Sequence, residues 1–162
     1  MRIAIYPGTF DPVTNGHIHI AERASRLFDK VIIAVALDNY KTTLFTLEER
    51  KKMMRDSTRH IENVEVQSFS GLVVEYARAK DAKALIRGLR AITDFEYEMQ
   101  YAAMNKHLDE KLETVFLMTA DKYAFLSSSV VKQIAVLGGS IKGLVPDNIE
   151  KCLQEKYRDT KS

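Results

Sequence analysis

Residues 2–17 read RIAIYPGTFDPVTNGH, and this stretch shows how the chain is built. Residues 2–6 form a short apolar run, which is typical of a buried strand. The two prolines and two glycines that follow favour a rigid turn, which brings His17 into the first turn of a helix. The stretch therefore predicts one strand, one tight loop and the start of one helix.

The same alternation of strand and helix repeats along the rest of the chain. Short β-branched runs at residues 31–36, 64–69, 84–87 and 115–118 predict four more strands. Thr46 and Thr93, each followed three residues later by a glutamate, predict capping boxes at two helix starts. Residues 128–137 and 146–157 predict two final helices. Apolar residues at helical spacing support the earlier helices, in the sets Ile20, Ala24, Leu27; Val73, Tyr76, Ala77; and Tyr97, Tyr101, Met104, Leu108.

Strands that alternate with helices indicate a parallel sheet with right-handed crossovers. We expect a single domain over residues 1–162, with a doubly wound, Rossmann-like α/β fold, a five-stranded parallel sheet and helices on both faces. In such sheets ligands bind at the carboxyl ends of the strands. Unusual polar residues cluster just after the strands of this sequence, which is where that rule places a site.

Composition excludes several other classes of protein. The 162 residues are 46% hydrophobic and 28% charged, which is ordinary for one globular domain and excludes a disordered chain. The formal net charge is +2 and charges of both signs are interspersed, so we expect no nucleic-acid-binding face. No run approaches the ~18 apolar residues of a membrane span, and the single cysteine excludes an internal disulfide. We therefore expect a cytoplasmic protein without a membrane partner. We also expect the cysteine and five of the methionines to pack in the core: Cys152, Met53, Met54, Met99, Met104 and Met118.

The loop after the first strand favours an anion. His17 would lie at a helix N-terminus, where free amides and the helix dipole attract phosphate. A surface histidine in a helix cap is the ordinary alternative. A metal site is not expected, because His17 and His19 are two residues apart and point to different sides of a helix. The sequences of the phosphate-binding P-loop and of the dinucleotide-binding glycine turn are both absent.

Three later segments carry similar chemistry. Arg87 and Arg90 follow the fourth strand, and arginine forks bind phosphate in a bidentate way. The alternative is that they pair with Asp94, Glu96 or Glu98. Lys41 follows the second strand, and the serines at 127–129 follow the fifth, where hydroxyls and bare amides can face a ligand.

These motifs resemble a known family. GTFDPVTNGH at residues 8–17 resembles the nucleotidyltransferases of the HxGH/TxGH superfamily, in its TxGH form. Residues 45–50 (FTLEER), 85–91 (LIRGLRA) and 94–100 (DFEYEMQ) are similar to the bacterial phosphopantetheine adenylyltransferases. The resemblance covers nearly the whole chain.

The resemblance implies roles for individual residues. It makes His17, Lys41, Arg87 and Thr9 catalytic, and assigns Thr9, Lys41, Val73 and Arg87 to the acceptor substrate, with no metal-ligating residue. Lys132 stands at the place of a basic residue of the wider superfamily. The implied ATP site comprises Thr9, Phe10, His17, Gly88, Leu89, Arg90, Glu98, Tyr123, Ala124, Phe125, Leu126, Ser127, Ser128 and Ser129.

The resemblance also implies an activity. The family transfers AMP from Mg-ATP to 4′-phosphopantetheine, which gives 3′-dephospho-coenzyme A and pyrophosphate by in-line attack on the α-phosphorus. It further implies Mg²⁺ with the nucleotide, a homohexamer, and coenzyme A as feedback inhibitor. Two alternatives stay open: another TxGH nucleotidyltransferase with a different phosphorylated acceptor, and a nucleotide-binding module without turnover.

Overall fold

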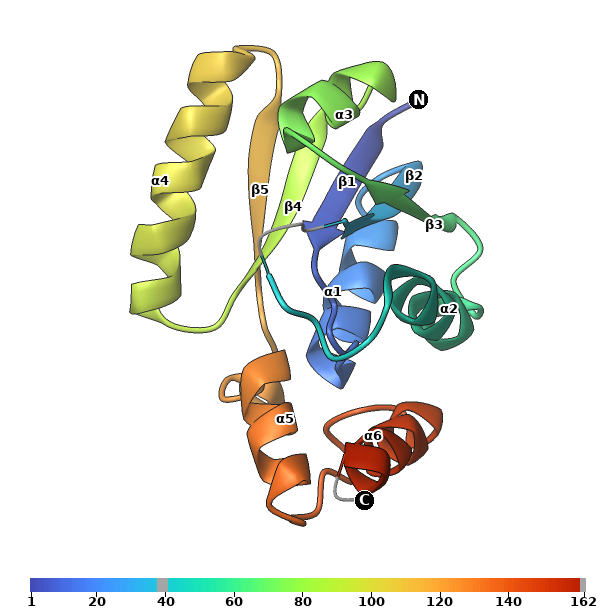
Figure 1. Ribbon diagram of the computed structural model, residues 1–162. Helices are drawn as coiled ribbons and strands as arrows, with labels where there is room; N and C mark the ends of the chain where they lie inside the picture. The colour runs from blue at the N-terminus through green and yellow to red at the C-terminus, as the bar shows by residue number, and fades with distance from the viewer. Residues whose placement is uncertain (38–40, 161–162) are drawn as a thin grey trace.

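The computed structural model describes residues 1–37 and 41–160, with the backbone alone at residues 92 and 93. Five parallel strands form one sheet in the order β3-β2-β1-β4-β5 (Figure 1). Their bounds are β1 Ile3–Gly8, β2 Lys30–Ala36, β3 Val64–Phe69, β4 Ala84–Leu89 and β5 Glu113–Met118. The predicted single-domain, doubly wound α/β fold is confirmed, and the strands differ from the predicted runs only at their ends.

The helices follow the strands in alternation, as predicted. Their bounds are α1 Asn15–Ser25, α2 Leu47–Thr58, α3 Val73–Ala79, α4 Ile92–Leu108, α5 Ser128–Val136 and α6 Asp147–Thr160. A short 3-10 helix covers Asp121–Tyr123. In the part of the chain that the structure describes, no helix is both long and apolar enough to span a bilayer.

The strand order reverses between β1 and β4, and this point creates a crevice. β1 pairs with β2 over its whole length, from Ile3 opposite Lys30 to Gly8 opposite Val35. It pairs with β4 only at Ala4 and Ile5. The carboxyl halves of β1 and β4 therefore separate, which is where a doubly wound sheet binds its ligands.

Two cores of unequal size hold the helices on the sheet. The larger core contains buried residues of α1, α2, α5 and α6 together with Ala4, Ile33 and Ile86 of the sheet. The smaller core lies on the other face, where Val74 and Ala77 of α3 pack against Ile5 and Leu85. Helices thus cover both faces, and the face under α1 and α2 carries most of the buried apolar area that stabilises the fold.

Helix α4 departs from the expected packing. Its apolar stripe predicted a helix correctly, but the side chains of Tyr97, Tyr101, Met104 and Leu108 are between 43% and 58% exposed. Glu98 is the only buried residue among residues 94–108 of this helix. Figure 1 shows α4 along β5 at the edge of the molecule. The prediction that Met99, Met104 and Met118 pack in the core is therefore wrong, whereas Met53 and Met54 are buried and Cys152 is partly buried against the larger core.

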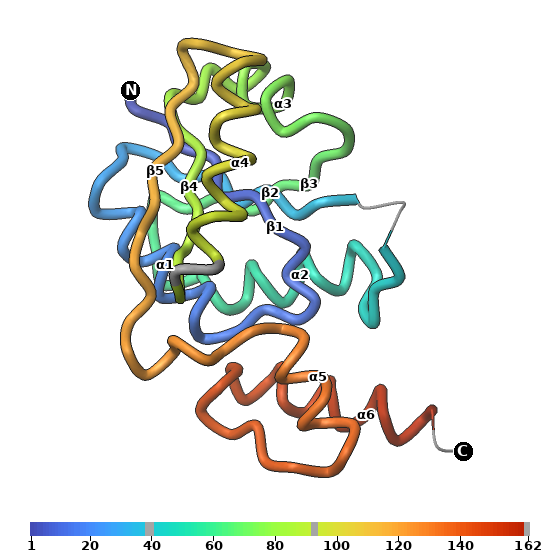
Figure 2. The backbone as a smooth tube through the Cα atoms, turned by 90° about the vertical axis from the view of Figure 1, so that its left-hand side faces the viewer, coloured from blue at the N-terminus to red at the C-terminus, as the bar shows by residue number. Residues whose placement is uncertain are grey.

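Helices α5 and α6 lie together beyond the carboxyl ends of the strands (Figures 1 and 2). The segment between them is tied to the start of α1, because the backbone N–H of Asn15 donates to the carbonyl oxygen of Leu144 at 2.9 Å. The Asn15 side-chain amide also donates to the carbonyl oxygen of Gly143 at 2.8 Å. The C-terminal pair of helices therefore supports the loop that follows β1.

The helix starts test the capping predictions. At Thr46 both hydrogen bonds of the predicted capping box with Glu49 are present. The box predicted at Thr93 is wrong, because α4 begins at Ile92 with Ala91 in the N-cap position and no side chain capping it. The Asp94 carboxylate instead accepts from the backbone N–H of Arg90 at 3.2 Å, so a residue inside the first turn binds the chain just before the helix.

Candidate active site

Two adjoining cavities open at the carboxyl ends of β1 and β4. The larger has a volume of about 620 Å³ and is lined by the loop after β1, the end of β4, the start of α4 and the serines before α5. The smaller, of about 320 Å³, lies between α3 and α4. Residues common to both walls are Pro7, Gly8, Thr9, Lys41, Arg87, Tyr97 and Glu98. The arrangement can hold two ligands that meet at one shared wall.

The first turn of α1 fixes the ring of His17. Thr14 is the N-cap, and its hydroxyl oxygen accepts from the His17 backbone N–H at 3.3 Å. The Thr14 backbone N–H donates to His17 Nδ1 at 3.0 Å. Because a backbone N–H can only donate, Nδ1 must be the unprotonated nitrogen, and in the neutral ring the proton sits on Nε2. His17 is thereby prepared to donate a hydrogen bond from Nε2.

The surroundings of His17 keep it neutral. Burial, assisted by the positive charges of Arg90 and Arg87, lowers the pKa of His17 to about 4. Phe10 covers the ring edge-on, with the two ring centroids 4.9 Å apart. At neutral pH His17 is consequently a donor without a charge, rather than a proton-transfer group or a cation.

The chain conformation before α1 brings Phe10 over this ring. Phe10 has a left-handed backbone with a φ of 51°, and its side chain is 3% exposed. Its ring lies against Gly8, where an added Cβ would approach the ring to 2.7 Å. Gly8 is therefore required by close packing, because any side chain there would displace Phe10 from His17.

Arg87 is held by a buried carboxylate. Its Nε donates to Glu98 Oε2 at 2.7 Å and its Nη2 to Glu98 Oε1 at 2.6 Å. Its Nη1 donates to the carbonyl oxygen of Pro7 at 3.1 Å. Glu98 is 8% exposed, so it is buried although it lies on a helix whose other described side chains are more exposed. A guanidinium has five N–H groups, and those not used within the described chain can still reach a phosphate in either cavity.

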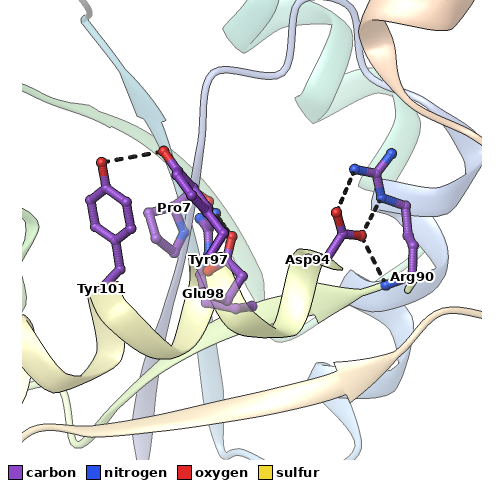
Figure 3. Close-up of polar contacts among 7 residues, drawn as sticks. Pro7, Arg90, Asp94, Tyr97, Glu98 and Tyr101 are labelled. Carbon is purple, nitrogen blue, oxygen red and sulfur yellow. Dashed lines mark hydrogen bonds and ion pairs between the residues drawn. The ribbon is translucent and has the colours of Figure 1, made fainter. Parts of the chain in front are cut away.

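Arg90 is oriented in the same manner by Asp94. Its Nε donates to Asp94 Oδ2 at 3.0 Å, and Asp94 lies on the first turn of α4 (Figure 3). Its Nη1 donates to the carbonyl oxygen of Leu126 at 3.0 Å, in the loop before α5. Both arginines therefore form the carboxylate pairs that the sequence left as an alternative, and both line the larger cavity as well. The pairs set the direction of each guanidinium.

Asp11 holds the segment that follows Lys41 in place. The Asp11 carboxylate is 4% exposed and accepts from the backbone N–H groups of Leu44 and Phe45, each at 2.9 Å. Lys132 Nζ on α5 donates to the same carboxylate at 3.1 Å. Asp11 thus links the loop after β1, the Lys41 loop and α5 at the floor of the larger cavity.

A buried arginine, Arg50, also binds backbone groups of these loops. Arg50 is 2% exposed, and its Nη1 donates to the carbonyl oxygens of Thr9 at 2.8 Å and Ala36 at 2.9 Å. Its Nε donates to the carbonyl oxygen of Phe45 at 3.2 Å. One side chain therefore joins the ends of β1 and β2 to the start of α2.

The serine segment closes the opposite wall. Ser127 is the N-cap of α5, and its hydroxyl oxygen accepts from the Val130 backbone N–H at 3.1 Å. Ser128 Oγ donates to the carbonyl oxygen of Pro12 at 2.7 Å. These bonds join the helix N-terminus of α5 to the loop that contains His17, so two helix N-termini, α1 and α5, line one cavity.

Known proteins are similar to this chain over nearly its whole length. The cytidylyltransferase-like family model matches residues 5–134. A phosphopantetheine adenylyltransferase from Moorella thermoacetica is 58% identical over 97% of this chain and 98% of its own length. One from Clostridium novyi is 53% identical over 96% of this chain and 97% of its own. The chain belongs to the phosphopantetheine adenylyltransferase family.

Solved structures share the fold at low identity. A putative nicotinate-nucleotide adenylyltransferase from Vibrio parahaemolyticus superimposes with a TM-score of 0.70 at 16% identity, covering 98% of this chain and 97% of that one. A bifunctional NMN adenylyltransferase/ADP ribose pyrophosphatase from Francisella tularensis gives 0.68 at 16% identity, covering 98% of this chain and 51% of that one. At this level of identity the likeness concerns the fold alone.

The larger cavity brings together most residues predicted from the family resemblance. Thr9, Lys41, Arg87 and Glu98 line both cavities, and Val73 lines the smaller one. Of the residues that the resemblance assigned to the ATP site, these line only the larger cavity: Phe10, His17, Gly88, Arg90, Leu126, Ser127, Ser128 and Ser129.

Four predicted residues do not line either cavity in this structure: Leu89, Tyr123, Ala124 and Phe125. Leu89 is buried at the end of β4, and Phe125 is 92% exposed. Their part in an ATP site stays a prediction. In the segment between β2 and Lys41, residues 38–40 lie outside the described part of the chain.

Sequence reasoning missed what Asp11 and Arg50 do. Both stand inside quoted motifs, GTFDPVTNGH and FTLEER, yet neither was assigned a role. The available signal was a charged residue inside each motif, directly after Phe10 in the first and at the end of the second. Only the structure shows that these charges bind backbone groups of three segments.

Proposed function

We propose that this protein transfers the AMP moiety of ATP to 4′-phosphopantetheine, giving 3′-dephospho-coenzyme A and pyrophosphate. The observation that supports this most is the pair of cavities with one shared wall, which bears Thr9, Lys41 and Arg87. The relatives carry the name of this activity at more than half identity over almost their whole length. They favour it over another acceptor and over a module without turnover.

The larger cavity suits the nucleotide phosphates. His17, Arg90 and the serines before α5 all line it. Nε2–H of His17, the remaining N–H groups of Arg90 and the backbone amides at the start of α5 are the kinds of donor that bind phosphate oxygens. The smaller cavity suits the pantetheine arm, because Phe69, Val73 and Ala102 offer an apolar lining and Asn105 a polar group. The two substrates would meet at Arg87 and Lys41.

The chemistry then needs orientation and charge neutralisation. An oxygen of the acceptor phosphate attacks the α-phosphorus, a new P–O bond forms, and the bond to the bridging oxygen of the pyrophosphate breaks. The nucleophile is already an anion, so no base is required. His17 would donate to an α-phosphate oxygen as charge grows there, while Thr9, Lys41 and Arg87 hold the acceptor phosphate.

The described residues offer no set of side chains that would enclose a metal ion. Among the described residues no group of three histidine, cysteine or acidic side chains could hold an ion. The cavity carboxylates of Asp11, Asp94 and Glu98 are each bonded to a cationic side chain. Mg²⁺ would therefore enter as part of the substrate Mg-ATP, held by phosphate oxygens and water.

Assembly and feedback complete the proposal. The exposed apolar side chains of α4 are typical of a surface buried by a second copy, which supports the expected homohexamer. Coenzyme A contains the same pantetheine arm as the acceptor, so we expect it to inhibit by competing for the smaller cavity.

We also propose a cytoplasmic location for this protein, because the cytoplasm supplies its substrate ATP.

Steady-state kinetics test the assignment of His17. Removing one transition-state donor lowers turnover about 100- to 1000-fold, so we expect His17→Ala to lose most of kcat with a smaller change in the KM for ATP. His17→Gln keeps an N–H donor and serves as the control, with an intermediate rate. A near-normal kcat in His17→Ala would reject this role.

A further inference from the structure

Tyr6 on β1 carries a hydroxyl group that the mechanism above does not use. The residue is 5% exposed, and its ring packs edge-on against Phe10 with the centroids 5.3 Å apart. Phe10 in turn covers His17. A tyrosine hydroxyl in such a buried place normally has a hydrogen-bond partner, so its bonding must be accounted for.

No described residue forms a hydrogen bond with Tyr6 Oη. The hydrogen-bonded tyrosine hydroxyls of the described chain are those of Tyr76, Tyr97 and Tyr101. Among the described residues, every side-chain nitrogen or oxygen that is sealed from solvent has a hydrogen-bond partner. Tyr6 Oη must therefore touch open space. Tyr6 lines the larger cavity and not the smaller one.

The surroundings favour a donor toward an anion. Burial raises the pKa of Tyr6 above its ordinary value. The positive charge of Arg87 opposes this rise, and the negative charge of Glu98 adds to it. The hydroxyl stays protonated in the whole working range of pH. The same cavity contains His17, Arg90 and Lys132, which are suited to phosphate oxygens.

We propose that Tyr6 Oη donates a hydrogen bond to a phosphoryl oxygen of a bound substrate, which makes Tyr6 a further catalytic residue. This inference rests on the proposed function. The shared chemistry is a phosphoryl oxygen, and its source is either the nucleotide or the acceptor phosphate.

The substitution Tyr6→Phe removes the hydroxyl and keeps the ring against Phe10. A hydrogen bond to a charged oxygen contributes enough that we expect kcat/KM to fall about tenfold. A raised KM for ATP alone assigns the bond to the nucleotide, a raised KM for phosphopantetheine alone assigns it to the acceptor, and a lowered kcat assigns it to the transition state. All constants within twofold of wild type would overturn the proposal.

The matched control is Tyr76→Phe. Tyr76 Oη donates to Gln67 Oε1 at 2.6 Å, and Tyr76 lines neither cavity, so we expect unchanged kinetics. An inactive wild-type protein in the same assay would reject the proposed function instead of this inference.

A crystal structure keeps the inference testable if Tyr6→Phe does not fold. The wild-type protein would be crystallised with phosphopantetheine and α,β-methylene-ATP. We expect Tyr6 Oη within about 3 Å of a phosphoryl oxygen, the length of a hydrogen bond. A separation above about 4 Å from every phosphoryl oxygen would overturn it.

Discussion

At the scale of single residues, the backbone N–H of Thr14 decides how His17 works. It occupies Nδ1, which leaves Nε2 to carry the proton toward the larger cavity. Burial and two arginines then prevent the ring from gaining a second proton near neutral pH. The same pattern recurs at Arg87 and Arg90, where a carboxylate fixes the direction of a group that is left with further donors.

The His17 ring gives a testable titration. Its pKa of about 4 lies below the value of about 6.5 for an exposed histidine. Between these values the unfolded chain binds more protons, so stability falls as pH drops from about 6.5 through 4. Nitrogen-15 NMR should show the Nε2–H tautomer from pH 8 to 5.5. A midpoint near 6.5, or a proton on Nδ1, would contradict this account of the site.

The two arginine pairs predict separate kinetic effects. In Glu98→Gln the fork of Arg87 loses its carboxylate, and we expect the KM for phosphopantetheine to rise about tenfold because the phosphate-holding group is misdirected. Asp94→Asn is the matched change at Arg90, and it should raise the KM for ATP instead. The division of roles between the two arginines would be disproved by a change in the same KM in both variants.

At the scale of elements, the Lys41 loop depends on Asp11 for its position. Asp11→Asn turns one acceptor into a donor facing Leu44 N–H or Lys132, so we expect a loss of about 1–3 kcal/mol in the free energy of unfolding and a higher KM for phosphopantetheine. Urea denaturation and kinetics measure the two effects. Thr46→Ala, which removes the cap of α2, should cost about 1 kcal/mol and leave that KM unchanged. Equal KM values in the two variants would contradict the clamp.

The elements also show how far sequence reasoning reaches. The strands are short runs whose residue types identify them in the sequence. Thr46 with Glu49 is a local signal, and α2 begins where that signal predicts. The start of α4 could not be predicted from a local signal of this kind. There the Asp94 carboxylate accepts hydrogen bonds from the backbone and side chain of Arg90, which directly follows β4. Glu98 and Arg87 lie 11 residues apart, and the packing of α4 against the strand that precedes it, β4, brings them to 2.6 Å. The residue types of the site were predictable, but their pairing was not.

At the scale of the whole molecule, the two faces of the sheet are unequally covered. The face under α1 and α2 has a large core, whereas α4 contributes no buried apolar side chain among residues 94–108. Apolar spacing alone cannot tell whether a helix stripe packs on its own sheet or on another chain. In the proposed homohexamer, the exposed stripe of α4 would be covered by another copy of the chain.

Assembly can be measured directly by light scattering. We expect the wild-type protein to form an oligomer and Met104→Glu to lower its mass, because a charge would be placed within the apolar surface of α4. Leu137 directly follows α5, and 85% of the residue is exposed. Leu137→Glu is therefore the control and should keep the wild-type mass. A monomeric wild-type protein at assay concentration would reject the homohexamer.

Product analysis tests the central claim most directly. Mass spectrometry would follow the protein with Mg-ATP and 4′-phosphopantetheine, beside parallel reactions with CTP and glycerol phosphate and with ATP and nicotinamide mononucleotide. We predict dephospho-coenzyme A and pyrophosphate in the first reaction and no product in the others. Product in either parallel reaction alone, or in none of the three, would contradict the proposed function.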